Sequence, residues 1–247
     1  MLADEICRQL LLSDEEHRAE DIRIGLGYTA VALEDGRCGL AYTLHEKEYE
    51  SCTVIADAGT LAGRKTSELI SWMKHSDETA FAIGLATANA LIDIPDGAIE
   101  SDILDLLQVG SQESVGMIGY FGPLVGPIRK NARSLHIFER KPIPELGVLP
   151  DTAAGDLLPQ CQVVVLSATT ILNQTIDGLL DCCKSAREIA VLGPSTPFLP
   201  EPFRKRGVTV LSGVQVIDGP RVLRVVSEAG GTRNFGTAIR KLTLRLT

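Results

Sequence analysis

Apolar and polar residues change rhythm near Gly110, and this change divides the chain into two parts. Beyond Gly110, short and nearly continuous apolar runs alternate with stretches whose apolar residues recur at helical spacing. The runs that we interpret as strands are Val115–Phe121, Leu135–Glu139, Val163–Ser167, Glu188–Leu192 and Val208–Leu211. Such strands, alternating with amphipathic helices, are typical of a parallel sheet that is covered on both faces. We therefore predict a Rossmann-like parallel-sheet domain over residues 110–247.

The helices of this second part each show one apolar face. The clearest one is predicted over Asn173–Lys184. A later helix follows Asp218, which can cap it, takes Pro220 into its first turn and ends at Gly230. Leu242–Leu246 is predicted to form a final strand.

The first part, residues 1–109, has a different pattern. Apolar residues four apart at its start predict a helix over residues 2–10. Ile22–Leu33 and Arg37–Leu44 are predicted to be two strands of a hairpin, because Asp35-Gly36 between them is a strong turn sequence. Further helices are predicted over residues 67–74, 79–92 and 103–107. A hairpin followed by helices indicates a small α+β domain, and since no long linker follows it, we expect it to pack closely on the parallel-sheet domain.

Composition and charge narrow the classes of partner. The 247 residues are 45% hydrophobic and 23% charged, an ordinary globular mixture, and the formal net charge is −8. A negative chain does not attract the phosphate backbone of nucleic acid or an anionic membrane surface. The start of the chain does not resemble a signal peptide, no apolar run is long enough to span a membrane, and the six cysteines show no C-x-x-C spacing. We therefore predict a cytoplasmic protein with reduced thiols and a small-molecule partner, and a homo-oligomer is compatible with the sequence.

Candidate binding residues follow the predicted strands, because ligands of open parallel sheets lie beyond the carboxyl ends of the strands. Gly119 and Gly122 follow the first of these strands, where they form either a tight turn or a close approach to a ligand. Glu139 ends the second strand, twenty residues after Gly119. An acid at this offset accepts hydrogen bonds from a ribose in nucleotide-binding sheets, but a solvated charge has the same appearance.

The other candidates are mostly hydroxyl-bearing or glycine residues of later loops. Thr169, Thr170, Asn173 and Thr175 crowd the junction after the third strand, where one of them is enough to cap a helix and the rest can bind a polar ligand. The remaining candidates are Gly193, Pro194, Ser195 and Thr196 after the fourth strand, Gly213 after the fifth, Gly231 and Thr232 after the late helix, and Asn89 in an apolar helix of the first part. Asn89 fits a core amide and a cleft residue equally well.

Several familiar catalytic and metal-binding patterns are missing from the sequence. The four histidines are scattered without H-x-x-x-H spacing, and no G-x-S-x-G elbow or Walker loop occurs. We therefore predict no metal-ligating side chains and assign no catalytic residue. His45-Glu46-Lys47-Glu48 is interpreted as a solvated turn.

Two segments of the second part, Leu166–Thr175 and Leu192–Pro197, resemble the heavy-metal chelation domain family, as do Leu211–Asp218 and Gly230–Thr232. The first part resembles the usual companion domain of that family, an uncharacterised domain with an enolase N-terminal-like fold, through Gly25–Val31 and Ala88–Leu91. The resemblance implies an enolase-N-terminal-like domain packed on a Rossmann-like domain, a shared cleft, and a role in handling heavy metals or a metal-binding small molecule.

Two functions remain open from the sequence. The first is binding or handling of a small polar, metal-chelating ligand in the cleft between the domains, where the metal is a heavy-metal ion carried by the small chelator. The second is a transferase or synthase of a cofactor or metallophore pathway that uses a nucleotide-like or pterin-like molecule. The loops are rich in Gly, Thr, Ser and Asn and poor in acid–base groups, which favours the first function.

Overall fold

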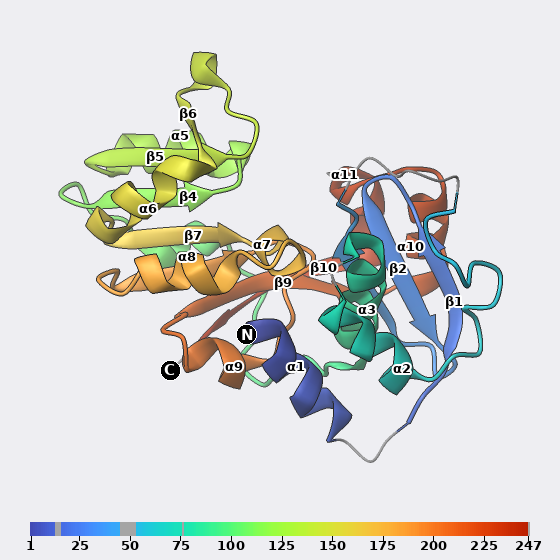
Figure 1. The fold of residues 1–247 in the computed structure, drawn as a ribbon. Coiled ribbons are helices and arrows are strands. Elements are labelled where there is room, and N and C mark those ends of the chain that lie inside the picture. Colours follow the sequence, from blue (N-terminus) through green and yellow to red (C-terminus); the bar gives the residue numbers. More distant parts are fainter. Residues whose placement is uncertain (13–15, 45–52, 76, 247) are drawn as a thin grey trace.

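The computed structural model describes residues 1–12, 16–44, 53–75 and 77–246. It is a mixed α/β fold with a seven-stranded sheet and a three-stranded antiparallel sheet (Figure 1). The strands are β1 (Ala19–Ile24), β2 (Tyr28–Leu33), β3 (Cys38–Tyr42), β4 (Ser114–Ile118), β5 (Ser134–Glu139), β6 (Val148–Pro150), β7 (Val163–Ser167), β8 (Glu188–Leu192), β9 (Val210–Val216) and β10 (Ile239–Arg245). The α-helices are α1 (Leu2–Leu11), α2 (Thr66–Ser71), α3 (Glu78–Leu91), α4 (Ile103–Leu107), α5 (Gly122–Asn131), α6 (Ala154–Leu157), α7 (Thr169–Leu172), α8 (Ile176–Cys182), α9 (Pro200–Arg204), α10 (Gly219–Ser227) and α11 (Thr232–Phe235).

The large sheet has the strand order β10-β9-β8-β7-β4-β5-β6 and is parallel except for β10, which pairs antiparallel with β9. The five strands predicted beyond Gly110 are all present in it. The three-residue β6 was not predicted, because an edge strand of this length leaves almost no periodic pattern. The predicted final strand is confirmed as β10.

Successive residues of the central strand β7 face opposite layers of the molecule. Val163 and Val165 join the core cluster under α4 and α5, whereas Val164 and Leu166 join the cluster under α6 to α9. Strand β7 is therefore covered on both faces, which explains why its sequence is continuously apolar.

The small sheet has the order β1-β2-β3, and its β2–β3 hairpin turns at Asp35-Gly36 as predicted. The single strand predicted over Ile22–Leu33 is wrong, since the segment forms two antiparallel strands, β1 and β2. The reason is Gly25, whose N–H donates to the Tyr28 carbonyl at 2.9 Å to close the turn. A Cβ at Gly25 would lie 2.2 Å from the Val226 carbonyl oxygen of α10, so only glycine fits this approach.

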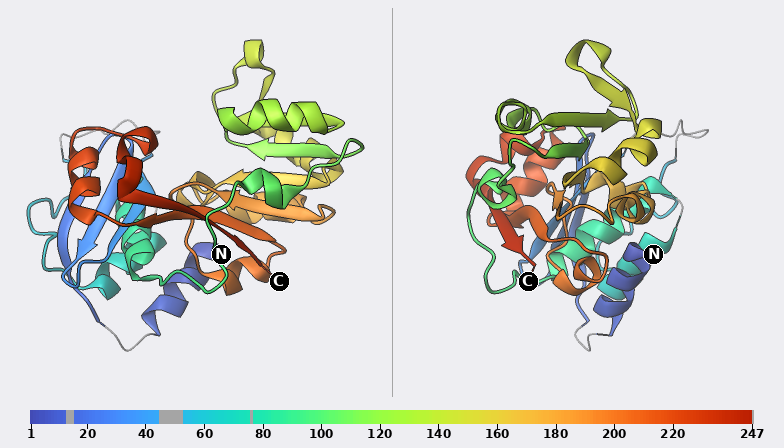
Figure 2. Two further views of the ribbon diagram at one scale, coloured as in Figure 1. Left: turned by 180° about the vertical axis from the view of Figure 1, so that it is seen from behind. Right: turned by 90° about the vertical axis from the view of Figure 1, so that its left-hand side faces the viewer.

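The last part of the chain returns to cover the small sheet. Val222 and Val226 of α10 and Phe235 of α11 pack against Tyr28 and other residues on one of its faces. The long strands β9 and β10 belong to the large sheet and extend from its other strands to the small sheet (Figures 1 and 2). Residues beyond the predicted boundary at 109/110 thus contribute to the layer built by the first part, and the boundary itself stays a prediction.

The opposite face of the small sheet lies under α3, and the core there continues into the large sheet. One cluster of buried apolar side chains joins residues of α1, α2 and α3 to residues of α7 and α8. Helix α1 begins with the Leu2 N–H donating to both carboxylate oxygens of Asp177 at 3.1 and 3.0 Å. The two halves therefore share a core and are tied by polar contacts.

Helix boundaries differ from the predicted ones where the backbone is interrupted. The helix expected over Asn173–Lys184 is α8 alone, and α7 precedes it across a break in which Gln174 has a φ of 59°. Asp218 caps α10 as predicted, because its carboxylate accepts the Arg221 N–H at 3.0 Å. Within the described residues, every helix is too short or too polar to cross a membrane.

Candidate functional site

Strand β4 is the first parallel strand of the large sheet, and the order in which later strands are added reverses beside it. The chain proceeds from β4 to β5 and β6 on one side, and then from β7 to β8 and β9 on the other side. Helix α5 packs on one face of the sheet and α8 packs on the opposite face. The loops after β4 and β7 therefore diverge, and this divergence opens a crevice at the carboxyl ends of the two strands.

A cavity of about 450 Å³ lies in this crevice, and we name it the switch-point cavity. Its walls come from the ends of β4, β5 and β7, from α7 and α8, and from the end of β3 in the first half of the chain. The lining residues are Tyr42, Leu44, Ile118–Phe121, Phe138–Arg140, Asp151, Ser167, Thr169, Thr170, Asn173, Thr175 and Leu179. Six predicted site residues lie together here: Gly119, Glu139, Thr169, Thr170, Asn173 and Thr175.

The turn after β4 is held by glycine geometry and by a carboxylate. Gly119 has a φ of +93°, and a Cβ on it would lie 2.9 Å from the Ser167 Cβ at the end of β7. The Glu139 Oε1 accepts the Tyr120 N–H at 2.7 Å. The acid at the end of β5 therefore fixes the turn between the cavity and α5.

The hydroxyl-rich segment after β7 is partly engaged in its own fold. The Ser167 and Thr169 hydroxyls bond each other at 2.8 Å, and the Thr170 hydroxyl donates to the Ser167 carbonyl at 2.6 Å. The Thr175 hydroxyl donates to Asn173 Oδ1 at 2.7 Å. Each hydroxyl keeps acceptor capacity, and the Asn173 amide keeps its two N–H donors, so the segment presents neutral hydrogen-bonding groups and no acid–base pair.

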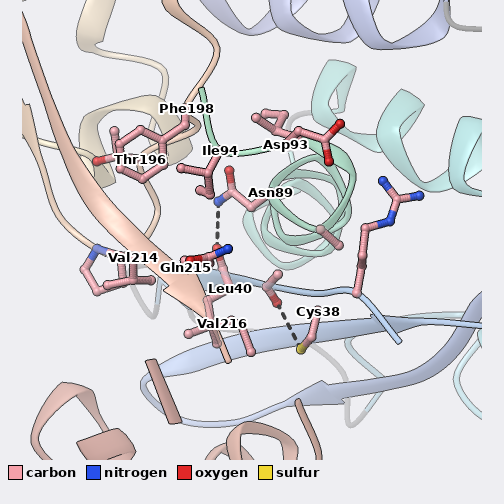
Figure 3. A pocket seen from close by; sticks show the side chains of 15 residues that line it. Cys38, Leu40, Asn89, Asp93, Ile94, Thr196, Phe198, Val214, Gln215 and Val216 are labelled. Atoms are coloured by element: carbon pink, nitrogen blue, oxygen red, sulfur yellow. Dashed lines mark hydrogen bonds between the residues drawn. The ribbon is translucent and has the colours of Figure 1, made fainter. Parts of the chain in front are cut away.

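A second cavity of about 190 Å³ lies between the two halves of the chain, and we name it the inter-domain cavity (Figure 3). It is lined by residues of β3, the end of α3, the loop after β8 and the end of β9. Three predicted site residues lie here: Asn89, Pro194 and Thr196. Among the described residues, Asn89 Oδ1 and Thr196 Oγ1 are buried without a hydrogen-bond partner.

The two cavities are separated by a polar joint between β3 and the loop after β8. Asn89 Nδ2 donates to the Leu40 carbonyl at 2.8 Å and to the Ser195 carbonyl at 3.3 Å. The Ser195 hydroxyl oxygen accepts the Tyr42 N–H at 2.8 Å. Ser195 and Asn89 thus fix the position of Tyr42, which lines the switch-point cavity.

Ser195 and the other five predicted residues do not line either cavity. Gly122 is the first residue of α5, the Gly193 N–H donates to the Ser212 carbonyl, and Gly213 packs closely on Thr196 and Phe198. Gly231 and Thr232 begin α11 on the small sheet, where the Thr232 hydroxyl bonds the Tyr28 hydroxyl at 2.8 Å. Gly231 and Thr232 lie at the start of a helix. A glycine and a threonine at such a position occur both in binding loops and in packing contacts, so the sequence did not distinguish the two.

Sequence reasoning missed several residues that line the switch-point cavity. Tyr120 lies inside the glycine turn predicted to face a ligand, but the prediction rested on the glycines alone. Arg140 directly follows Glu139 in the sequence. Its Nε lies 3.9 Å from Asp151 Oδ2 in an ion pair. Tyr42 comes from the other half of the chain, and no sequence feature connects it with β4 or β7.

The side chains that the structure describes do not fit direct coordination of a heavy-metal ion. Among the described residues, no three His, Cys, Asp or Glu side chains are grouped to hold a metal. Burial raises the pKa of Cys7 and Cys161 to about 11 and that of Cys38 and Cys183 to about 12, so these thiols stay protonated at neutral pH. Soft metals bind the thiolate form and imidazole in preference to hydroxyl oxygens. His45–Glu48 and Cys52 lie outside the described residues.

Comparison with known proteins assigns the family. A family model described as "putative heavy-metal chelation" matches residues 102–245, which is more than half of the chain. The chain belongs to this family, DUF364. A second model with the same description matches residues 8–92.

Relatives of this DUF364 protein match nearly its whole length. An uncharacterized protein of Methanocaldococcus jannaschii is 28% identical over 243 residues, which are 94% of this chain and 92% of that protein. Two crystal structures of DUF364 proteins of unknown function are each 25% identical to it. The one from Desulfitobacterium hafniense has a TM-score of 0.83 and covers 98% of both chains, and the one from Pyrococcus horikoshii has a TM-score of 0.84 and covers 99% of this chain and 100% of its own.

Proposed function

We propose that this DUF364 protein binds a small polar organic ligand in the switch-point cavity, and that any heavy metal it handles is carried by that ligand. The observation that supports the proposal is the place of the cavity, at the reversal of strand order between β4 and β7. Ligands of open parallel sheets bind at this position. The volume of about 450 Å³ falls within the range of about 300–1,000 Å³ typical of small-molecule sites.

The lining favours a metal complex over a bare ion. Hydroxyl and amide groups of Thr169, Thr170 and Asn173 face one side of the cavity, and Glu139 and Arg140 lie on another. These groups suit hydrogen bonds to the oxygen and nitrogen atoms of an organic chelator. The chelator's own donor atoms then satisfy the metal, which the protonated cysteines do not.

The test compares metal complexes with the free ions. Purified protein is titrated with iron(III) citrate, nickel(II) histidine, and the chloride salts of nickel, zinc and cadmium, while thermal unfolding and native mass are recorded. A complex present at a hundredfold excess over its Kd stabilises the fold by about 2.7 kcal/mol, a rise in Tm of roughly 5–10 °C. The proposal predicts such a shift for at least one complex and none for the free ions.

A cavity-filling variant locates the binding. Thr169→Phe places a phenyl group in the switch-point cavity, and we expect it to abolish the shift and the bound mass. Thr237→Phe is the matched control, because Thr237 is exposed and does not line the cavity. A shift that survives in Thr169→Phe, or one produced only by free ions, contradicts the proposal.

A second candidate function is a transferase or synthase that uses a nucleotide-like or pterin-like cofactor. It is favoured by the carboxylate of Glu139 beside the Gly119–Tyr120 turn, at the position where nucleotide-binding sheets hold a ribose. Incubation with nucleotides and pterins, followed by native mass spectrometry, distinguishes it: a bound cofactor that is absent from Thr169→Phe supports it, and no bound mass at saturating cofactor contradicts it.

A further inference from the structure

The carboxylate of Glu139 has one oxygen directed to the protein and one left for a ligand. Glu139 ends β5, and Gly119 after β4 donates its N–H to the Phe138 carbonyl at 2.9 Å, so the turn and the acid lie side by side. Oε1 accepts the Tyr120 N–H at 2.7 Å. Within the described chain no donor bonds Oε2, and the half-buried side chain lines the switch-point cavity. A carboxylate oxygen in this setting is a strong acceptor for hydroxyl groups.

The turn itself has few donors left for a phosphate. The N–H groups of Gly119 and Tyr120 are bonded as described, the Leu124 N–H donates to the Phe121 carbonyl at 2.8 Å, and Pro123 has no N–H. Pyrophosphate sites at such turns depend on several free backbone N–H groups. The turn therefore does not fit a pyrophosphate.

Aromatic side chains give the same cavity an apolar wall. Tyr120 and Phe121 follow β4, and Tyr42 comes from β3. Tyr120 is 38% exposed, so its ring is accessible to a ligand. Aromatic ring faces stack on planar heterocycles, and any nucleobase can stack in this way.

From these observations we infer that the switch-point cavity recognises a ribonucleoside group that carries no pyrophosphate. The ribose hydroxyls donate to Glu139 Oε2, and the base lies against the aromatic wall formed by Tyr42, Tyr120 and Phe121. The inference rests on the proposed function, because it names the ligand class of the same cavity.

One substitution tests Glu139 Oε2, which is left for the ligand, while it keeps the hydrogen bond that Oε1 makes to the Tyr120 N–H. Glu139→Gln keeps a carbonyl oxygen that accepts the Tyr120 N–H, but it replaces the other acceptor with an N–H₂ donor. Its matched control is Glu145→Gln, because Glu145 is exposed and outside the cavity. Equal thermal stability of the two variants and the wild type without ligand shows that the fold is retained.

Binding is measured by calorimetry with adenosine, guanosine, cytidine and uridine, then with the 2′-deoxy and 3′-deoxy forms of the nucleoside that binds best, and with ADP and NAD⁺. We expect at least one ribonucleoside to bind. Loss of either hydroxyl, or Glu139→Gln, should weaken it at least tenfold, as expected for a hydrogen bond to a charged group. ADP and NAD⁺ should bind more weakly than the nucleoside, and Glu145→Gln should leave all affinities unchanged.

The outcomes distinguish this inference from the proposed function. Ribonucleosides that bind without regard to the hydroxyls or to Glu139→Gln overturn the inference, as does tighter binding of NAD⁺. If no nucleoside binds but a metal complex does, and Thr169→Phe abolishes that binding, the inference is overturned and the proposed function stands. If neither class binds, both are overturned.

Discussion

At the scale of single residues, Gly119 is under the tightest constraint at the cavity. Its φ of +93° is strained for other residues, and a Cβ would lie 2.9 Å from the Ser167 Cβ. We predict that Gly119→Ala lowers the free energy of unfolding by about 2–4 kcal/mol, because left-handed strain of about 1–3 kcal/mol adds to the steric overlap. Denaturation in urea measures the change.

Gly36→Ala separates strain from overlap. Gly36 has a φ of +88°, close to that of Gly119, but a Cβ there would meet no other part of the described chain within 4 Å beyond its immediate neighbours. We expect Gly36→Ala to lose only the strain, about 1 kcal/mol. An equal loss in both variants would show that the close approach of β4 and β7 costs nothing and is not a constraint on the cavity.

At the scale of elements, α1 is anchored to the other half by charge. Glu5 bonds Arg206 at 2.7 Å and Lys205 at 3.0 Å. Hydrogen bonds from Arg206 and then Lys205 lower the pKa of Glu5 from 4.5 to about 2. The ionised form is therefore stabilised in the folded state, so its contribution is complete above pH 4.5 and is lost as the pH falls toward 2.

We predict that Glu5→Gln lowers the free energy of unfolding at pH 7 by about 1 kcal/mol. The difference from the wild type should shrink between pH 4.5 and pH 2, as followed by denaturation at several pH values. Glu201→Gln is the control, since Glu201 pairs with Arg204 and Lys205 at the surface and should change stability by less than about 0.5 kcal/mol. A pH-independent effect of Glu5→Gln would exclude a role for its charge.

At the scale of the whole molecule, the joint at Asn89 and Ser195 couples the two halves. We predict that Asn89→Leu lowers the free energy of unfolding by about 1–3 kcal/mol, because the two bonds to the Leu40 and Ser195 carbonyls are lost. Trp72, the single tryptophan, reports on the first half, and circular dichroism reports on both. The two transitions should coincide in the wild type and separate in the variant.

Asn131→Leu is the comparison for this variant, because Asn131 is exposed at the end of α5 and lies far along the sequence from the joint. Its two transitions should still coincide. Coincident transitions in Asn89→Leu would mean that the shared apolar core alone holds the halves together.

Local patterns in the sequence determined the element types and the family. The run Val163–Ser167 indicated a strand buried on both faces, Asp35-Gly36 a hairpin and Asp218 a helix cap, and each is present. These features depend on residues within one turn or one strand, so the sequence alone carries them. The acid at Glu139 and the hydroxyls at Thr169 and Thr170 were placed at one sheet edge for the same reason, since parallel strands end together.

Contacts between distant segments were decided only by the tertiary structure. Position 25 requires glycine because α10, which comes much later in the chain, passes against it. Thr232 packs on Tyr28, Asn89 and Thr196 lie in a separate cavity, and Tyr42 completes the site from the other half. Periodicity and turn chemistry describe neighbours along the chain, whereas a cavity is formed by side chains that meet through packing, and no local pattern specifies which ones meet.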